Sequence, residues 1–329
     1  MATPAAHILH EQLAERRARL EIAIAGGKSD PGLQRLLEQV DGALARFEAH
    51  EYGRCLICHE DVEAPDLLRN PLLEYCLCRL TPAEQRALEA DLTLARRIQG
   101  GLLPEPRLRA PGWEAAYSYV PAGMVSGDFC DLWQRSGELS TIYFAVGDVS
   151  GKGIAASLLM AHLQAAFRSR FEDGMPLGDL VGGVNRQLMK ASLPGHFATL
   201  ACGRAGQGGE IDLVNAGHCP PLLHGSRGVE ALQPTEIPIG VLPDRPYTVQ
   251  SLRLQQGDML LLYTDGLTEA RRADDAEYGQ ERLERLLSAS GQDTPPELLV
   301  QSVTRDLDEF LGGAPRADDI TVMALRRAA

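Results

Sequence analysis

The chain has 329 residues, of which 44% are hydrophobic and 23% are charged, and it carries a formal net charge of −13 at pH 7. These values are ordinary for a globular protein of two or three domains, and the acidic balance argues against direct binding of DNA or RNA, which needs a basic surface. No hydrophobic run reaches the length of a membrane span, and the first residues lack the segments of a signal peptide, so we expect no membrane partner.

Two helices are expected at the N-terminus. Residues 5–26 are rich in Ala, Leu, Glu and Arg, and the glycines and proline of residues 26–32 interrupt this pattern. From Leu33 to Phe47, hydrophobic residues recur at steps of three and four, as on one face of a helix. The two segments predict a helical hairpin with one hydrophobic face, which is also suited to form a dimer seam.

Four of the seven cysteines follow within a short stretch. Cys55 and Cys58 form a first pair, and Cys76 and Cys78 form a second. Two cysteine pairs that lie this close together in the sequence are typical of a tetrahedral zinc site, in which four side chains bind one ion. The odd total, with the other three cysteines scattered, favours a reducing cytoplasm over a disulfide framework. We therefore expect one structural Zn²⁺ and a cytoplasmic location.

The stretch from about residue 33 to residue 80 resembles the DksA/TraR zinc-finger family in its cysteine pairs, its preceding helix and Tyr52-Gly53. It departs from that family in the second pair, which has one intervening residue instead of two. His59 is a candidate to replace one thiolate, and a degenerate finger without metal is the alternative. Relatives that dock on RNA polymerase use acidic residues at the tip of a long hairpin. Here the tip offers only Asp30, so we expect a structural or sensory finger.

A third helix is expected from Thr81 to Leu102. Thr81, Pro82 and Glu84 provide a cap, a first-turn proline and a capping box. A hydrophobic stripe runs along the helix at Leu88, Leu92, Ala95, Ile98 and Leu102. Because such a stripe is costly to leave in water, it must pack on the following domain or on a second copy of itself. We expect a parallel homodimer through this helix and the hairpin, with a passive spacer as the alternative.

Beyond this helix the pattern changes. From Trp113 onward, short strands alternate with two helical stretches near residues 153–171 and 178–191, and strands dominate after residue 197. This mixture indicates an α+β domain. We therefore divide the chain into a hairpin and finger (residues 1–80), a linker helix (81–104) and an α+β domain (105–329).

One carboxylate stands at the end of a predicted buried strand. The hydrophobic run 142–146 leads into Gly-Asp-Val-Ser-Gly-Lys-Gly at residues 147–153, and a helix begins behind it. The strand fixes Asp148 and the loop exposes it, which suits a functional residue. The glycines do not form a Walker-type phosphate loop, because Gly153 stands where that loop needs Ser or Thr.

Other predicted strands also carry an aspartate at one end. Asp128 lies in a Gly-Asp corner, Asp265 follows the hydrophobic run 259–262, and Asp318 and Asp319 open the last strand. A single aspartate of this kind is more often a turn or cap residue. Four such corners together predict convergence on a site for Mg²⁺ or Mn²⁺, which prefer carboxylate, carbonyl and water ligands.

The segment from about residue 95 to the end resembles the metal-dependent, PPM-type serine/threonine phosphatases, in the bacterial SpoIIE/RsbU subgroup. The matching blocks occur in the family's order: Ala95–Gln99 with Leu102–Pro104, Gly127–Phe129, Gly147–Gly153, Phe197–Leu200, Asn215–His218, Tyr263–Ala270 and Asp318–Thr321. The resemblance implies two packed antiparallel sheets covered by helices on both sides, with the metals at one end of the sandwich.

The resemblance also implies a two-metal phosphomonoester hydrolase that uses Mn²⁺ or Mg²⁺. The implied ligands are Asp128, Asp148, the carbonyl of Val149, Asp265 and Asp318, with Asp319 able to share the role of Asp318. Asp148 would bridge both ions. Ser150 stands where eukaryotic relatives have a His that is a proposed general acid, so we expect a metal-bound water to protonate the leaving group. His218 lies in a Gly-rich turn and is expected to be structural more than catalytic.

The function implied is that of a protein phosphatase acting on phosphoserine or phosphothreonine, with a STAS-type anti-sigma-factor antagonist as the expected substrate. One alternative is a non-catalytic regulatory scaffold whose finger binds a transcription partner. The complete set of aspartates argues against it. A hydrolase of small phosphoesters is a third interpretation.

Overall fold

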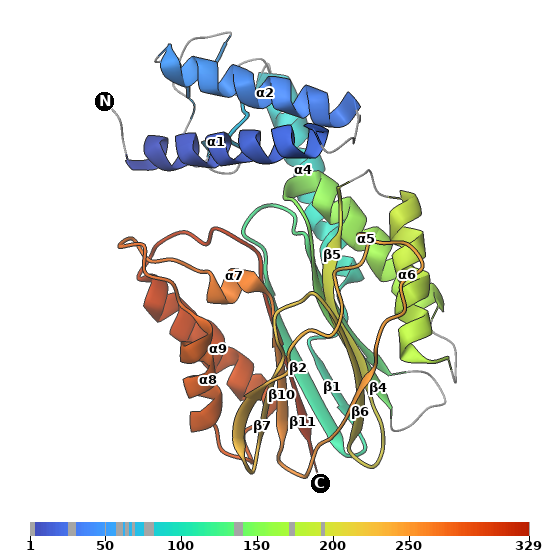
Figure 1. Cartoon of the computed structure of the whole chain (residues 1–329). Helices are drawn as coiled ribbons and strands as arrows, with labels where there is room; N and C mark the ends of the chain where they lie inside the picture. Colours follow the sequence, from blue (N-terminus) through green and yellow to red (C-terminus); the bar gives the residue numbers. More distant parts are fainter. Residues whose placement is uncertain are drawn as a thin grey trace. The chain divides into compact units, whose positions relative to one another are not determined.

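The computed structural model (Figure 1) describes residues 4–25, 31–49, 51–56, 62, 66–67, 70–75, 82–134, 141–170, 175–191 and 195–328. The chain divides into two compact units, residues 1–91 and residues 92–329, so the division falls inside one helix. Among the described helices, none combines the length and the hydrophobicity that crossing a membrane requires.

The first unit contains the expected helical hairpin. α1 runs from Pro4 to Ala25 and α2 from Pro31 to Glu48. Leu13 and Leu20 of α1 pack with Val40 and Ala43 of α2 in a small buried core. The prediction of two helices that share a hydrophobic face is therefore confirmed.

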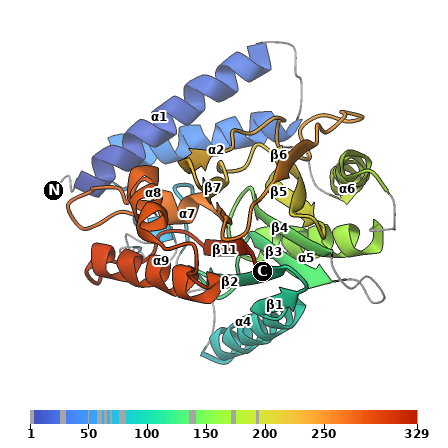
Figure 2. The same ribbon diagram turned by 90° about the horizontal axis from the view of Figure 1, so that it is seen from below.

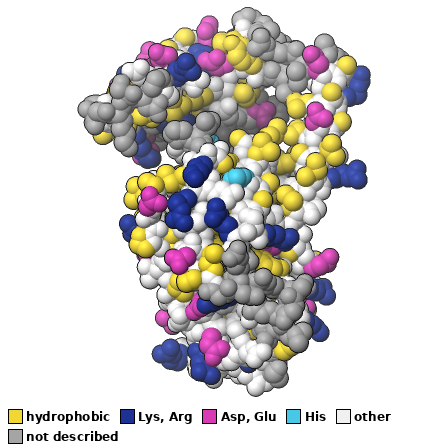
Figure 3. Space-filling model, turned by 90° about the vertical axis from the view of Figure 1, so that its right-hand side faces the viewer, with side chains coloured by type: hydrophobic (Ala, Val, Ile, Leu, Met, Phe, Trp, Pro, Cys, Tyr) yellow, Lys and Arg dark blue, Asp and Glu magenta, His cyan; other side chains and the backbone are white. Residues whose placement is uncertain are grey.

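The linker helix α4 runs from Pro82 to Leu102, as the sequence indicates. Its covered face differs from the predicted stripe. Gln99 is only 7% exposed, and Leu92 is partly buried, whereas Leu94 and Ile98 are 53% and 60% exposed. Ile98 therefore lies off the packed face and a glutamine lies on it. Figure 3 shows the right-hand side of the molecule in Figure 1, where hydrophobic side chains gather next to several Lys and Arg side chains.

Two antiparallel sheets form the second unit. One has the strand order β1-β2-β11-β10-β7-β8 and the other the order β3-β4-β5-β6-β9. The strands of the first sheet are β1 (Arg107–Ala110), β2 (Trp113–Val120), β7 (Leu222–Gly225), β8 (Gly228–Ala231), β10 (Met259–Tyr263) and β11 (Ile320–Arg327). Those of the second are β3 (Asp128–Gln134), β4 (Ile142–Val149), β5 (Ala198–Ala205), β6 (Glu210–Ala216) and β9 (Gln250–Arg253).

Helices cover the outer face of each sheet. α5 (Gly153–Arg170) and α6 (Leu177–Ala191) lie on the sheet that contains β4, and α8 (Gln280–Ala289) and α9 (Pro296–Leu311) lie on the other (Figures 1 and 2). The α+β sandwich with helices on both sides is thereby confirmed. The expectation that strands dominate after residue 197 overlooked α8 and α9.

Among its described residues, the second unit has three hydrophobic cores: one between the two sheets, one under α5 and α6, and one under α8 and α9. They explain why the central strands are continuous hydrophobic runs in the sequence. In β10, Leu260 and Leu262 face the core between the sheets, while Leu261 and Tyr263 face the core under α8 and α9. Successive side chains of a strand point to opposite faces, so a strand covered on both faces is hydrophobic throughout. The rigid, buried centre of the sandwich therefore fixes the position of the residues at the ends of its strands.

Candidate metal centre

Asp128 and Asp148 lie opposite each other on neighbouring strands. The antiparallel pairing of β3 with β4 sets Asp128 against Asp148, and the pairing of β4 with β5 sets Asp148 against Thr199. Gly147 permits this close approach, because a Cβ there would stand 2.4 Å from the carbonyl oxygen of Thr199. The sheet thus holds the backbone of both carboxylates in fixed register.

Asp265 and Asp318 come from the other sheet. Asp265 begins the short helix α7 (Asp265–Thr268) after β10, and Asp318 lies just before β11. β10 and β11 are antiparallel neighbours, so the two carboxylates stand at the same end of this sheet. At Gly266 a Cβ would stand 2.0 Å from the carbonyl oxygen of Asp319, so the close passage of these two segments requires glycine.

Hydrogen bonds to Asp128 join the two sheets at this end. Its Oδ2 accepts hydrogen bonds from the hydroxyls of Thr264 at 3.0 Å and Thr321 at 2.5 Å. Burial raises the pKa of Asp128 well above its ordinary value, the Thr321 hydrogen bond lowers it, and the charge of Asp148 raises it again. Asp128 is therefore a buried carboxyl that is held in place before any ligand binds.

The remaining carboxylates act on one another electrostatically. Burial, followed by the charges of Asp265, Asp318 and Asp319, raises the pKa of Asp148 to about 7, although the Lys152 ammonium lowers it. Burial and the charge of Asp318 also raise the pKa of Asp265. Buried carboxylates placed beside other negative charges repel those charges at neutral pH, and a bound cation would relieve that repulsion.

Asp318 and Asp319 have different surroundings. Both carboxylate oxygens of Asp319 accept backbone hydrogen bonds, from Ala122 at 2.7 Å and Gly127 at 2.8 Å, so Asp319 clamps the loop before Asp128. Asp318 Oδ2 instead accepts a hydrogen bond from Lys152 Nζ at 2.7 Å. The geometry gives Asp319 a structural task and leaves Asp318 beside the other carboxylates.

Ser150 and His218 are both engaged in holding the fold. The Ser150 hydroxyl accepts a hydrogen bond from the Phe197 amide at 3.0 Å, and the Ser150 amide donates to the Phe197 carbonyl at 2.9 Å. His218 is buried, its Nδ1 lies 2.8 Å from the Thr199 hydroxyl, and burial lowers its pKa to about 4. A neutral, buried imidazole in this position agrees with the structural role expected from the sequence.

The donor set fits a hard divalent cation in its chemistry. The candidate ligands are carboxylate oxygens, with the carbonyl of buried Val149 beside them, and such all-oxygen sets suit Mg²⁺ and Mn²⁺. No three His, Cys, Asp or Glu side chains among the described residues form a ready-made ligand cage. The raised pKa values of Asp148 and Asp265, caused by burial and by neighbouring carboxylates, indicate a cation here; a closed coordination shell does not.

Gln99, which the sequence placed in a block shared with the family but gave no contact, connects α4 to this centre. Its amide donates to the Ser126 carbonyl at 2.7 Å and accepts from the Ser126 amide at 3.0 Å. Ser126 stands directly before Gly127 and Asp128. The α4 helix is also tied at its end, where Gln164 of α5 donates to the Leu102 carbonyl at 2.6 Å. A search restricted to hydrophobic periodicity could not identify a buried amide.

The predicted zinc ligands are described only in part. Cys55 is buried beside Leu9, Val62 and Leu67, whereas Cys58, Cys76 and Cys78 lie outside the described residues, as does His59. The Leu56 amide donates to the Glu74 carbonyl at 2.9 Å. This bond brings the chain after Cys55 next to the segment that leads to the second pair. The zinc site itself remains a prediction.

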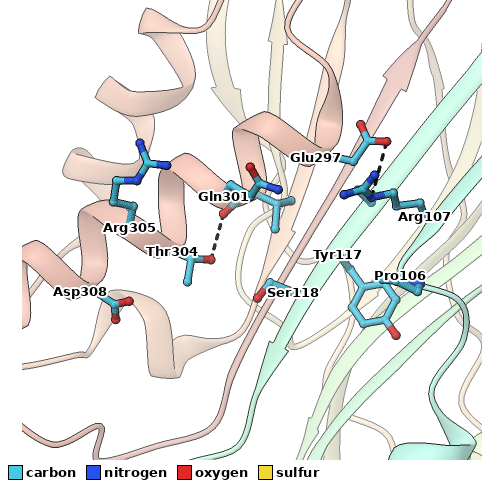
Figure 4. A pocket seen from close by; sticks show the side chains of 11 residues that line it. Pro106, Arg107, Tyr117, Ser118, Glu297, Gln301, Thr304, Arg305 and Asp308 are labelled. Carbon is cyan, nitrogen blue, oxygen red and sulfur yellow. Dashed lines mark hydrogen bonds and ion pairs between the residues drawn. The ribbon is translucent and has the colours of Figure 1, made fainter.

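A separate pocket lies between β2 and α9 on the outer face of one sheet (Figure 4). It has a volume of about 550 Å³, and Tyr117, Thr304 and Arg305 are among its lining residues. Arg107 approaches Glu297 at 4.0 Å on one side of it. None of the aspartates discussed above lines this pocket, so its lining adds nothing to the acidic centre.

Solved structures identify the class of this domain. The PP2C domain of SiaA from Pseudomonas aeruginosa is 21% identical with a TM-score of 0.62, covering 74% of this chain and 98% of that one. The RsbU and RsbW domains of Rv1364c from Mycobacterium tuberculosis are 28% identical with a TM-score of 0.58, covering 69% of this chain and 63% of that one. RsbX, solved in complex with magnesium, is 16% identical with a TM-score of 0.51, covering 67% of this chain and 97% of that one. The second unit therefore has the PP2C fold.

The family follows from the sequence of the same domain. The family model described as Stage II sporulation protein E (SpoIIE) matches residues 140–328. The chain belongs to this family.

Three curated relatives are similar over part of their length. Protein IcfG of Synechocystis is 28% identical over 72% of this chain and 41% of its own length. Phosphoserine phosphatase RsbU of Bacillus subtilis is 24% identical over 74% of this chain and 72% of its own. Phosphoserine phosphatase RsbP of the same organism is 30% identical over 54% of this chain and 45% of its own length. The chain thus spans less than half of IcfG and RsbP.

Proposed function

We propose that this chain is a metal-dependent protein phosphatase that hydrolyses phosphoserine or phosphothreonine. The observation that carries the proposal is the convergence of Asp128, Asp148, Asp265 and Asp318 at one end of both sheets. There, burial and the charges of Asp265, Asp318 and Asp319 raise the pKa of Asp148 to about 7. The membership in the SpoIIE family and the names of RsbU and RsbP support the same reaction.

Two Mn²⁺ or Mg²⁺ ions would be held by Asp128, Asp148, the Val149 carbonyl, Asp265 and Asp318. When bound, such ions supply an activated water and neutralise phosphoryl oxygens. The chain's own contribution is to orient these carboxylates. Thr264 and Thr321 hold Asp128, and Asp319 fixes the loop before it. The Ser150 hydroxyl accepts a hydrogen bond from the Phe197 amide, and the His218 imidazole is buried and neutral. We therefore assign proton transfer to neither residue.

The substrate is proposed to be a phosphorylated regulatory protein of the STAS type, an anti-sigma-factor antagonist. This rests on the similarity to RsbU and RsbP. The alternative of a non-catalytic scaffold is not favoured, because the carboxylate set is complete and each member keeps a defined position. A cytoplasmic location, suggested by the scattered cysteines, remains part of the proposal.

The N-terminal unit and α4 are proposed to regulate this activity. One structural Zn²⁺ bound by Cys55, Cys58, Cys76 and Cys78 would stabilise the segment after α2, in keeping with the hydrogen bond from Leu56 to Glu74. A homodimer through α4 would cover Leu94 and Ile98, which are exposed to water. Gln99 supplies a connection from that helix to the loop before Asp128.

The test is hydrolysis of phosphopeptides and p-nitrophenyl phosphate with saturating Mn²⁺. Asp148→Asn and Asp265→Asn should each abolish turnover while the fold is retained, because repulsion among the carboxylates is then reduced. Asp293→Asn, at an exposed aspartate, is the matched control and should retain turnover. Near wild-type turnover in either site variant would refute the two-metal assignment.

A further inference from the structure

Lys152 stands at the rim of the acidic centre. Lys152 lies in the loop after β4, between Gly151 and Gly153, whose φ angles are +102° and +75°. Its Nζ donates to Asp318 Oδ2 at 2.7 Å and to the Ala317 carbonyl at 2.9 Å. The Lys152 side chain is half exposed. The ammonium is therefore held beside the carboxylates but is not enclosed.

The arginines nearest in sequence to the carboxylates are committed to other partners. Arg271 binds Asp275 at 2.9 Å, and Arg316 binds Asp308 at 2.5 Å. By contrast, the Lys152 ammonium lies 2.7 Å from a carboxylate oxygen of Asp318, which stands beside the other carboxylates. Within the described part of the chain, the geometry leaves Lys152 as the cation placed to meet an anion at this centre.

We propose that Lys152 binds the phosphoryl group of the substrate. In the protein without metal, the Lys152 ammonium is instead hydrogen bonded to Asp318. The proposal rests on the phosphatase function above. Once divalent cations occupy the carboxylates, the negative charge that attracts the ammonium to Asp318 is largely neutralised. Lys152 is on a flexible four-carbon stem, and the dianionic phosphate of a phosphoserine or phosphothreonine is then the strongest acceptor within reach.

The proposal predicts opposite effects on metal and phosphate affinity. Lys152 competes with the metal for Asp318, so Lys152→Ala should bind Mn²⁺ at least as tightly as the wild type. The same variant loses a charge-assisted hydrogen bond to phosphate, so its affinity for inorganic phosphate should fall about tenfold or more. A residue that merely positions Asp318 would instead weaken both affinities together.

The experiment uses the full chain and two measurements that do not need turnover. Calorimetric titration gives the Mn²⁺ affinity without phosphate, and then the affinity of the Mn²⁺-loaded protein for inorganic phosphate. Steady-state hydrolysis of a phosphopeptide adds KM and kcat separately. We expect Lys152→Ala to raise KM more than it lowers kcat, Lys152→Arg to recover most of the phosphate affinity, and Lys190→Ala, at the end of α6, to match the wild type.

Three results would overturn the inference: unchanged phosphate affinity in Lys152→Ala, a parallel loss of Mn²⁺ and phosphate affinity, or a loaded wild-type protein that binds no phosphate. Failure of the proposed function is distinguishable from these. A wild type that binds phosphate through Lys152 but hydrolyses no phosphoester would refute the activity and leave the phosphate site established.

Discussion

At the scale of single residues, the carboxylate centre is a source of instability in the protein without metal. Asp148 has a pKa of about 7 in the fold against an ordinary value of 3.8. The folded state therefore retains a proton that the unfolded chain releases between about pH 4 and pH 7, and the free energy of unfolding falls as pH rises through that window. An asparagine at position 148 does not ionise, so the free energy of unfolding of that variant lacks this dependence on pH.

The first prediction follows from this difference. In the presence of chelator, Asp148→Asn should equal the wild type in stability near pH 4 and exceed it near pH 8, by roughly 1–3 kcal/mol. Thermal unfolding across this pH range measures the difference, and saturating Mn²⁺ should favour the wild type instead. A variant that is less stable than the metal-free wild type at pH 8 would contradict the proposed repulsion.

A second residue-scale prediction concerns Gly266. A methyl group here would stand 2.0 Å from the Asp319 carbonyl oxygen, so Gly266→Ala must push apart the segments that carry Asp265 and Asp318. We expect a loss of about 2–3 kcal/mol in unfolding free energy, measured by urea denaturation. Gly291→Ala is the control, because its Cβ would lie 3.7 Å from the Thr294 hydroxyl, an ordinary contact. Equal stability of the two variants would show that the close passage is not rigid.

At the scale of elements, α4 has a packed side and an exposed side. Gln99 bonds to the loop before Asp128, while Leu94 and Ile98 face water. If a second copy covers the exposed side, Ile98→Ser should convert a dimer into a monomer and change turnover, without altering Mn²⁺ affinity. Leu92→Ser, on a partly buried position, should also change both oligomeric state and turnover. Light scattering, activity and metal titration measure the three properties.

Controls for α4 separate regulation from a passive spacer. Arg97→Ser lies on the exposed side and should leave oligomeric state and turnover unchanged. A protein that begins at Pro104 retains β1, which pairs with β2, but lacks α4. If this shorter protein and the full chain are both monomeric and equally active, α4 is a spacer.

At the scale of the whole molecule, the first unit is small and has only two modest hydrophobic cores among its described residues. Such a unit gains much from a structural metal. We predict about one zinc per chain by elemental analysis of the full-length protein. Cys58→Ser should lose the zinc and Cys219→Ser, in the second unit, should retain it. Absence of zinc from the wild type, with helical content indifferent to chelator, would mean that the finger is degenerate.

Much of the architecture was determined by local sequence. The hydrophobic runs before Asp148 and Asp265 specify strands buried on both faces, and the aspartate that follows each must stand at a strand end. α5 and α6 were predicted close to their observed bounds. α9 was overlooked although Leu299, Val303, Leu307 and Leu311 repeat at four-residue steps, a signal that was present in the sequence.

Tertiary structure alone decided what each polar side chain touches. The sequence could not distinguish Asp318 from Asp319, because the loop at Ala122 and Gly127 that occupies Asp319 is distant in sequence. It could not place Gln99 against Ser126, nor Lys152 against Asp318. Periodicity reports which face of an element is buried, since burial follows a repeating geometry. Hydrogen bonds and ion pairs depend on which segments meet, and only the packed sandwich determines that.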